Sequence, residues 1–351
     1  MILEQTIQQA YKTLKESNIN SYQLDAEIIL SNIMGVTREF LITNSNQNVT
    51  KDVMQKYLKA IERRKRNEPV AYITGKKEFW SNDFMVNHGT LVPRPETELL
   101  IYKLISLYKN KKVNILDIGT GSGCILLSLL SELKKAKGTG IDISSKAIIT
   151  AISNAKKMKL LNRSRFKVLN FENFYSTKYD LIVSNPPYIP FKDIKNLNKD
   201  IKNFEPIVAL NGGNDGLDII KKIIYKSDCL LKKNGILAIE IGYNQYSKVN
   251  KLLKYNRYRA FPTDTRTLLD LNIVQFAVFQ KQRHTHSGTA AYLNDNIFTT
   301  QRISILEEIS NSDTTSWFDQ DSIGTKQFRA TLKRNAIGGH VRTYNFLLAQ
   351  D

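Results

Sequence analysis

Asn185-Pro186-Pro187-Tyr188 directly follows a short apolar segment, and this junction constrains the fold of the chain more than any other feature. The preceding residues 178–184 read KYDLIVS, and their apolar centre is typical of a strand buried on both faces. Such strands belong to parallel α/β sheets, in which ligands bind at the carboxyl ends of the strands. We therefore expect the tetrapeptide to lie at the functional edge of such a sheet.

The residue types in this tetrapeptide suit the recognition of a planar –NH2 group. Its two prolines stiffen the loop, because each fixes φ at about −65° and removes a backbone donor. Asn185 presents a side-chain oxygen and Pro186 a backbone carbonyl, so two acceptors can hold the two hydrogens of an amine. Tyr188 offers an aromatic face to a flat amide or base. The alternative is a plain turn, for which Asn-Pro is also a common sequence.

A glycine-rich loop follows an earlier predicted strand at residues 113–118. The loop consists of Gly119, Thr120, Gly121, Ser122 and Gly123, and a helix pattern begins at once after it. Glycines let a backbone pass close to a ligand, and the N-terminus of a helix favours a carboxylate or phosphate. The spacing G-x-G-x-G differs from the G-x-G-x-x-G of dinucleotide enzymes. Asp142 ends the next predicted strand, where it can accept hydrogen bonds from ribose hydroxyls.

The rest of the chain divides by its hydrophobic pattern. Strand and helix patterns alternate from residue 113 onward, which predicts a parallel sheet covered on both faces and closed by an antiparallel pair at residues 257–263 and 273–280. Residues 1–70 show helical periodicity, including a stop at Gly35 and a helix at 52–66 with Leu58 among its inward residues. Residues 70–92 predict a hairpin with its loop at 81–83. No pattern assigns residues 283–351, so we expect a flexible tail, with a short helix at 303–309.

Composition limits the class of protein. In 351 residues there is no run of 18 apolar residues, and the N-terminus lacks the layout of a signal peptide, so we expect a cytosolic protein. The two cysteines, Cys124 and Cys229, are expected to be buried free thiols. The net charge of +18 arises entirely from the first 282 residues. This charge favours an anionic partner, although a codon-level bias toward Lys, Asn and Ile would also produce it.

These motifs together resemble the class I S-adenosylmethionine-dependent methyltransferases that methylate a planar nitrogen. More narrowly, the chain resembles the HemK/PrmC family, the glutamine-N5 methyltransferases of peptide chain release factors. The narrower resemblance rests on residues 68–75 (EPVAYITG), on 91–98 (LVPRPETE), and on Glu205-Pro206 with residues 212–217 (GGNDGL). It covers about residues 1–281 and does not reach the tail.

The resemblance implies an architecture and an activity. The fold would be α/β, with a seven-stranded, mainly parallel Rossmann-like methyltransferase sheet and a small N-terminal helical domain. The domains would be a helical substrate-recognition domain at 1–70, a hairpin linker at 71–95, the methyltransferase domain at 96–282 and an unassigned tail at 283–351. The enzyme would transfer the methyl group of S-adenosylmethionine to the glutamine of the release factor GGQ motif.

The resemblance also implies site roles. Gly119 to Gly123 would approach the methionine part of the cofactor and Asp142 its ribose, while Phe171 would border the adenine, with Phe174 as the alternative. Asn185 and the Pro186 carbonyl would hold the substrate –NH2 group within the rigid Pro186-Pro187 loop, and Tyr188 would pack against the amide. No metal is implied.

Two other functions fit parts of the sequence. A DNA adenine-N6 or RNA methyltransferase could use the same tetrapeptide on a flipped base, and the net charge favours it. A non-catalytic module that keeps the fold and binds a partner is the second alternative. The basic run at residues 63–66 is expected to be a solvated helix end, with an RNA contact as the alternative. We expect a monomer with no membrane association, for which a nucleic-acid contact is not required.

Overall fold

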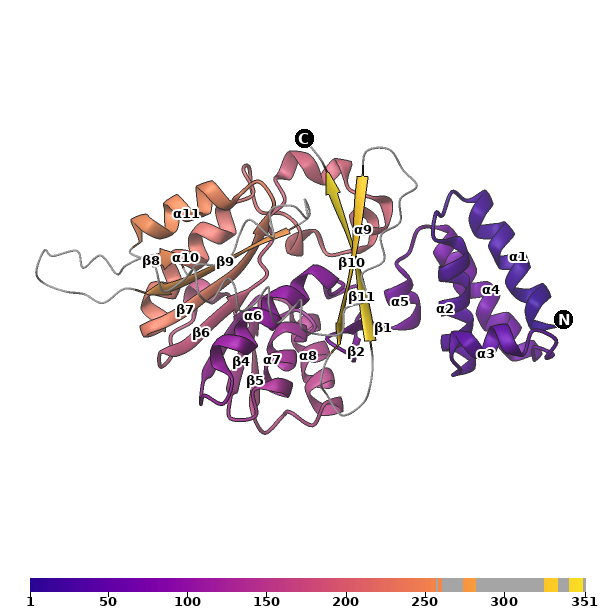
Figure 1. The fold of residues 1–351 in the computed structure, drawn as a ribbon, viewed down its shortest axis with the longest axis horizontal. Helices are drawn as coiled ribbons and strands as arrows, with labels where there is room; N and C mark the ends of the chain where they lie inside the picture. The colour runs from indigo at the N-terminus through magenta and orange to yellow at the C-terminus, as the bar shows by residue number, and fades with distance from the viewer. Residues whose placement is uncertain (257, 261–273, 282–324, 334–340, 350–351) are drawn as a thin grey trace, which may run out of the picture. The chain divides into compact units, whose positions relative to one another are not determined.

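The computed structural model describes residues 1–256, 258–260, 274–281, 325–333 and 341–349 (Figure 1). Contacts divide the chain into one unit of residues 1–261 and 276–282 and a second unit that contains β10 and β11. The first unit holds every residue of the candidate site. No helix within the described ranges combines the length and apolar character needed to cross a membrane.

The N-terminal part of the first unit is helical, as the periodicity predicts. Its helices are α1 (Leu3–Glu16), α2 (Tyr22–Met34), α3 (Arg38–Thr43), α4 (Lys51–Lys65) and α5 (Val70–Thr74). Gly35 ends α2 with a φ of 68°, a left-handed conformation that glycine adopts without steric cost. Tyr57 of α4 is buried, and its hydroxyl donates a hydrogen bond to the Ala26 carbonyl over 3.1 Å. The prediction for Leu58 is wrong, because the buried stripe of α4 runs through Tyr57, Ala60 and Ile61 and leaves Leu58 48% exposed.

The basic run at the end of α4 differs from the predicted solvated helix end. Arg64 is buried, and its Nε donates to the Asp25 carboxylate of α2 over 2.6 Å. Arg63 donates from Nε to Glu68 over 2.8 Å. Two of the four basic side chains therefore hold the bundle and its following segment together.

A short hairpin follows the helices. It pairs β1 (Lys76–Phe79) with β2 (Asn82–Met85) in antiparallel register. The two residues between the strands, Trp80 and Ser81, both have positive φ, of 51° and 56°. This is the two-residue turn whose twist matches that of a hairpin. The hairpin is confirmed, but its loop lies at 80–81 rather than 81–83.

The sheet of the first unit has the strand order β5-β4-β3-β6-β7-β9-β8. Its strands are β3 (Asn114–Ile118), β4 (Lys137–Asp142), β5 (Ser164–Val168), β6 (Tyr179–Ser184), β7 (Leu231–Gly242), β8 (Tyr258–Ala260) and β9 (Val274–Lys281). The pairs among β5, β4, β3, β6 and β7 are parallel, and β8 pairs antiparallel with β9. The mainly parallel sheet and its antiparallel closing pair are thus confirmed on the described residues.

Helices connect and cover these strands. They are α6 (Glu98–Tyr108), α7 (Cys124–Glu132), α8 (Ser145–Lys157), α9 (Lys199–Phe204), α10 (Asp218–Leu230) and α11 (Tyr246–Tyr255), with short 3-10 turns at Pro95–Thr97, Phe171–Asn173, Phe191–Asn196 and Ile207–Ala209. Residues 236–241 of β7 are all buried. Because successive side chains of a strand point to opposite faces, both faces of the sheet are covered there.

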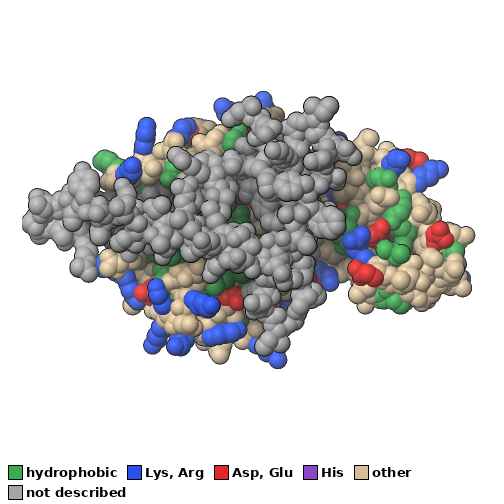
Figure 2. All heavy atoms as spheres, in the orientation of Figure 1, with side chains coloured by type: hydrophobic (Ala, Val, Ile, Leu, Met, Phe, Trp, Pro, Cys, Tyr) green, Lys and Arg blue, Asp and Glu red, His purple; other side chains and the backbone are tan. Residues whose placement is uncertain are grey.

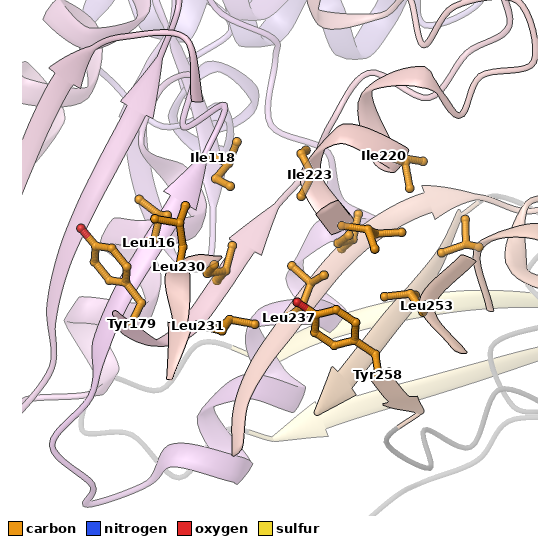
Figure 3. Packing of buried hydrophobic residues seen from close by; sticks show 14 of the residues in the cluster. Leu116, Ile118, Tyr179, Ile220, Ile223, Leu230, Leu231, Leu237, Leu253 and Tyr258 are labelled. Carbon is orange, nitrogen blue, oxygen red and sulfur yellow. The ribbon is translucent and has the colours of Figure 1, made fainter. Parts of the chain in front are cut away.

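The surface and the interior separate charge from apolar side chains. On the described part of the face in Figure 2, Lys and Arg side chains outnumber Asp and Glu. Beneath the surface, one apolar cluster joins the sheet to α10 and α11 (Figure 3). In that cluster Leu116 of β3, Leu237 of β7 and Ile223 of α10 are at most 1% exposed. This packing fixes the strands whose ends carry the site.

Two other expectations concern residues away from the site. Both cysteines are free, but Cys229 is exposed and Cys124 half-buried, so the prediction of two buried thiols is wrong for Cys229. The second unit contains an antiparallel pair, β10 (Thr325–Lys333) with β11 (Val341–Ala349), which the sequence did not predict. The helix expected at residues 303–309 lies outside the described residues.

Candidate active site

The parallel register brings the predicted site residues to one edge of the sheet. Ile118 at the end of β3 pairs with Ile141 of β4 and with Ser184 of β6, and Ser184 pairs in turn with Ile239 of β7. The residues that follow these four in the chain are Gly119, Asp142, Asn185 and Glu240. The glycine loop, the acidic residue and the tetrapeptide are therefore neighbours, as the sequence predicts.

The glycine loop adopts backbone conformations that favour glycine. Gly119, Gly121 and Gly123 have φ values of 72°, 55° and 80°. Among the residues that the structure describes, and apart from each glycine's chain neighbours, no heavy atom lies within 4 Å of the position that a Cβ atom would take at Gly119 or Gly121, whereas at Gly123 it would lie 3.1 Å from Leu127. Gly119 and Gly121 thus leave room beside the loop. Gly123 lets the start of α7 pack closely against Leu127 and Ala151.

Hydrogen bonds tie this loop to the acidic residue of the next strand. The backbone N–H of Gly121 donates to one oxygen of the Asp142 carboxylate, and that of Ser144 donates to the other, each over 2.9 Å. Burial raises the pKa of Asp142 above its ordinary value, although these backbone donors favour the charged form. The Asp142 carboxylate is thus fixed beside Gly121, and its oxygens have further lone pairs that can accept hydrogen bonds.

A second carboxyl group lies beneath the loop. Asp117 of β3 is fully buried and accepts a hydrogen bond from the Thr120 hydroxyl over 2.7 Å. Burial raises the pKa of Asp117 to about 7, and the nearby charge of Asp142 adds to the effect. The bond from Thr120 connects the end of β3 to the turn and supports the shape of the loop.

The tetrapeptide loop is fixed by the segment of residues 211–217. Ile189 forms a bridge to Asn211, and the Gln245 side chain donates to the Tyr188 carbonyl over 2.9 Å and to the Gly216 carbonyl over 3.1 Å. A Cβ atom at Gly216 would lie 2.3 Å from the Tyr188 carbonyl oxygen. Glycine is needed there so that the two backbones can approach.

Glu240 is a member of the site that the sequence analysis missed. It lies in β7, is fully buried and accepts hydrogen bonds from the Thr97 hydroxyl over 2.6 Å and from the Tyr188 hydroxyl over 3.3 Å. The Asn185 side-chain amide in turn donates to the Thr97 oxygen over 3.4 Å. The available signal was a single acidic residue inside the apolar run GILAIEIG.

Residues 91–98 reach the site through the side chain of Thr97. Thr97 is the residue before α6, but its side chain makes no capping bond and is turned to Glu240 instead. Arg94 donates to the Glu205 carboxylate over 2.7 Å, and that carboxylate is almost fully buried. Burial raises the pKa of Glu205, while Arg94 acts in the opposite direction. This ion pair links the segment to the chain that follows the tetrapeptide.

The two aromatic candidates after β5 differ in burial. Phe174 is 2% exposed and belongs to the apolar cluster, with its ring centroid 6.4 Å from that of Tyr179. Phe171 is half-buried and only packs against the cluster. Of the two rings, only that of Phe171 keeps a partly accessible surface.

The arrangement places an accessible loop backbone and a carboxylate side by side at the edge of the sheet. Glycines at positions 119 and 121 admit a close approach to the backbone, and Asp142 presents a carboxylate beside them. In the described part of the chain, no three His, Cys, Asp or Glu side chains are grouped so as to hold a metal ion. Hydrogen-bond acceptors at Asn185 and Pro186 lie on the adjacent strand end, within the same edge.

Comparisons with known proteins give consistent results. Residues 5–75 match the family described as the PrmC N-terminal domain, and residues 109–286 match a methyltransferase domain family. A release factor glutamine methyltransferase from Caulobacter vibrioides is 37% identical over 74% of this chain and 89% of its own length. The proteins of the same description from Clostridium acetobutylicum and Buchnera aphidicola subsp. Schizaphis graminum are 36% and 42% identical, over 75% and 69% of this chain and 94% and 88% of their own lengths.

Proposed function

Because the chain belongs to the family of release factor glutamine methyltransferases, we propose that it transfers the methyl group of S-adenosylmethionine to the side-chain nitrogen of the glutamine in the GGQ motif of peptide chain release factors. The observation that carries the proposal to the level of residues is the common sheet edge of the glycine loop, Asp142 and Asn185.

The glycine loop and the acidic residue are the proposed cofactor site. Gly119 to Gly123 would hold the methionine part, supported by the free space at Gly119 and Gly121. Asp142 would accept hydrogen bonds from the ribose hydroxyls, supported by its fixed position beside Gly121. Phe171 would border the adenine, because Phe174 is buried in the core. The bound cofactor supplies an electrophilic methyl group, which this chain's own side chains do not provide.

The tetrapeptide is the proposed substrate site. The Asn185 oxygen and the Pro186 carbonyl would accept the two hydrogens of the glutamine –NH2 group, with Pro187 keeping the loop rigid and Tyr188 lying beside the amide. Such a pair of acceptors orients the nitrogen, whose lone pair is otherwise delocalised into the carbonyl. It also selects against a glutamate, whose oxygens would face acceptors.

Asn185→Ala tests the substrate site. We expect methylation of a purified release factor to fall at least about a hundredfold, the usual loss when one oriented hydrogen-bonding group is removed from a site. The assay measures the mass of the GGQ-bearing peptide after reaction. A release factor with GGQ changed to GGE is the matched control and should stay unmodified. Full activity of Asn185→Ala would contradict the proposed role, and methylation of DNA or RNA but not of the release factor would favour the alternative substrate class.

Gly121→Ala tests the cofactor site. The φ of 55° makes any side chain at this position strained, by about 1–2 kcal/mol, and the methyl group would project into the proposed cofactor space. We expect weaker binding of S-adenosylmethionine by calorimetry. Gly35→Ala is the matched control, since it has a φ of 68° with open space but lies in the helical bundle. Equal cofactor affinity in both variants would contradict the assignment.

The remaining features of the enzyme are proposed on the same basis. We propose that residues 1–70 recognise the substrate, that 71–95 link them to a catalytic domain at 96–282, and that 283–351 lie outside the catalytic machinery. The enzyme would work as a monomer in the cytoplasm, where release factors act.

A further inference from the structure

Glu240 is a carboxyl group that the fold buries completely inside a strand. Its neighbours along β7 from Ile236 to Ile241 are apolar, and a buried charge is costly unless hydrogen bonds satisfy it. Two hydroxyls do so: Thr97 donates to one carboxylate oxygen over 2.6 Å and Tyr188 to the other over 3.3 Å. Both donors lie next to, or within, the proposed substrate site.

The number of protons on these groups determines how Asn185 is oriented. A threonine hydroxyl has one proton, and an ionised carboxylate can only accept. The Thr97 proton must therefore be directed to Glu240, which leaves the Thr97 oxygen as an acceptor. The Nδ2 atom of Asn185 lies 3.4 Å from that oxygen and donates to it. With its amino end held there, the Asn185 side chain turns its oxygen the other way.

We propose that Glu240 is a positioning residue that acts through Thr97 to fix which end of the Asn185 carboxamide faces the substrate amide. The inference rests on the proposed role of Asn185 as the acceptor for the glutamine –NH2 group. A reversed carboxamide would place the –NH2 group of Asn185 against that of the substrate. The hydrogen bond from the substrate to Asn185 and the one from Asn185 to Thr97 would then both be lost.

The protonation state of Glu240 decides whether this arrangement holds. Burial raises its pKa to about 7, and the charge of Glu96 adds to the effect, while the hydrogen bonds from the Thr97 and Tyr188 hydroxyls lower it. A protonated Glu240 can donate to Thr97, whose own proton is then free to turn toward Asn185 and favour the reversed carboxamide. Burial beside Glu240 also raises the pKa of Tyr188, so its hydroxyl remains a donor.

The other charged and titratable groups around this network come from different elements. In the segment before α6, the charge of Arg94 lowers the pKa of Tyr188 and the charge of Glu96 raises it. Burial raises the pKa of the Cys124 thiol in α7, and the charge of Glu240 adds to this effect. Asp117 also has a pKa raised to about 7, so the pH profile of the wild-type enzyme does not by itself identify the group. Substitution of Glu240 does.

Glu240→Gln is the direct test, because glutamine keeps the shape and can both donate and accept. We expect kcat for release factor methylation to fall about 10- to 100-fold, with the dissociation constant for S-adenosylmethionine unchanged. The wild-type kcat should decline below about pH 7, as expected for an essential group that titrates there, and the decline should be weaker in Glu240→Gln, where Asp117 still titrates near that pH. Wild-type activity in Glu240→Gln, or a decline below about pH 7 that is as large in it as in wild type, would overturn the inference.

Thr97 supplies an independent pair of variants if Glu240→Gln fails to fold. Thr97→Val keeps the shape but removes the hydroxyl, and it should reproduce the loss of kcat; Thr97 makes no capping bond that this change would remove. Thr97→Ser restores a hydroxyl and should recover most of the activity. Equal activities of Thr97→Val and Thr97→Ser would contradict the role of the hydroxyl.

Asn185→Ala separates this inference from the proposed function. If Asn185→Ala is inactive while Glu240→Gln and Thr97→Val behave as wild type, only the inference fails. If Asn185→Ala is fully active, the proposed site fails and the inference with it. In the double variant Asn185→Ala, Glu240→Gln we expect no further loss beyond Asn185→Ala, because Glu240 acts through Asn185; additive losses would overturn that route.

Discussion

Asp117 and Glu240 place two fully buried carboxyl groups at the carboxyl edge of the sheet, and burial raises the pKa of each to about 7. Threonine hydroxyls donate to both, Thr120 to Asp117 and Thr97 to Glu240, but these bonds do not offset the burial. Ionising either group at neutral pH therefore costs folding free energy. An apolar residue of similar size would avoid this cost, so the acidic residues serve the site rather than the stability of the core.

We expect this cost to appear in the pH dependence of stability. Because the folded-state pKa of Glu240 lies above its unfolded value, the folded protein binds the extra proton, and the free energy of unfolding falls as the pH rises from about 4 to about 7. The fall is on the order of 3 kcal/mol, since one pKa unit corresponds to about 1.4 kcal/mol. Urea denaturation of wild type and of Glu240→Gln at about pH 5 and about pH 8 measures it, and the variant should show the smaller decrease.

Other carboxyl groups contribute in the opposite direction. Hydrogen bonds and charges from Arg63 lower the pKa of Glu68, so its contribution to stability is present above its ordinary pKa and is lost on acidification. Wild type and Glu240→Gln share this contribution, so the difference between their two curves isolates Glu240. An identical pH dependence in both proteins would show that Glu240 has the same pKa folded and unfolded.

The sequence predicts those site residues that end an apolar strand. Gly119 and Asn185 directly follow such strands and Asp142 ends one, so parallel pairing alone brings them together. Glu240 could not be found in this way, because its partners come from other parts of the chain. Thr97 lies 143 residues away and Tyr188 lies 52 residues away, and only the folded sheet shows that they meet.

At the scale of elements, helix α8 holds the hairpin and the glycine loop in place through one side chain. Asn154 is buried; its oxygen accepts from the Met85 N–H of β2 over 2.7 Å, and its amide donates to the Met85 carbonyl over 3.0 Å. The same amide donates to the Ser122 carbonyl of the glycine loop over 2.8 Å. One asparagine thus satisfies three backbone groups in two separate segments.

Asn154→Ala should destabilise the protein and loosen the loop. The change leaves buried backbone groups without partners, at a cost of about 1–3 kcal/mol for each group that water cannot reach. We expect a lower midpoint of urea denaturation together with weaker binding of S-adenosylmethionine. Ser153→Ala on the same helix is the control, because among the described residues its hydroxyl donates to the Ile149 carbonyl of α8 and to no other group. A loss of stability with unchanged cofactor affinity would show that the loop keeps its shape without Asn154.

The hairpin shows why local patterns give elements more reliably than their turns. Residues 81–83 (Ser-Asn-Asp) have the composition of a turn, yet the chain reverses at Trp80-Ser81 with two positive φ values. The Glu98 carboxylate of α6 accepts from the Trp80 N–H over 2.8 Å, and the Trp80 indole donates to Glu132 of α7 over 2.9 Å. Contacts with distant helices thus support a turn that its own residues do not favour.

At the scale of the whole molecule, the positive charge and the catalytic sequence occupy the same part of the chain. The surplus of basic residues lies in the first 282 residues. The two family matches, at residues 5–75 and 109–286, cover nearly the same part of the chain. The charge is not concentrated in the run at 63–66, because Arg63 and Arg64 are paired with carboxylates. On the face in Figure 2, the basic side chains of the described residues lie at several separate places. Such a positive charge attracts acidic partners.

The boundary near residue 282 leads to a prediction about which part of the chain is needed for catalysis. Strand β9 ends at Lys281 and pairs with β8 in the sheet, so the catalytic fold requires the chain to that point. The release factor glutamine methyltransferases described above align with 69–75% of this chain. We expect a chain ending at Gln282 to keep kcat for release factor methylation within about twofold of the full chain. Steady-state kinetics and urea denaturation of both proteins provide the measurement.

A chain ending at Asn256 is the matched control for that truncation. It removes β8 and β9, which leaves the backbone of β7 as an unpaired edge next to a buried apolar cluster. An exposed edge of this kind favours aggregation, and the cluster loses Tyr258, which is 2% exposed. We expect this shorter chain to be insoluble or inactive while the one ending at Gln282 is neither. If the chain ending at Gln282 is folded but inactive, residues beyond it contribute to catalysis, and the proposed limit of the catalytic domain is wrong.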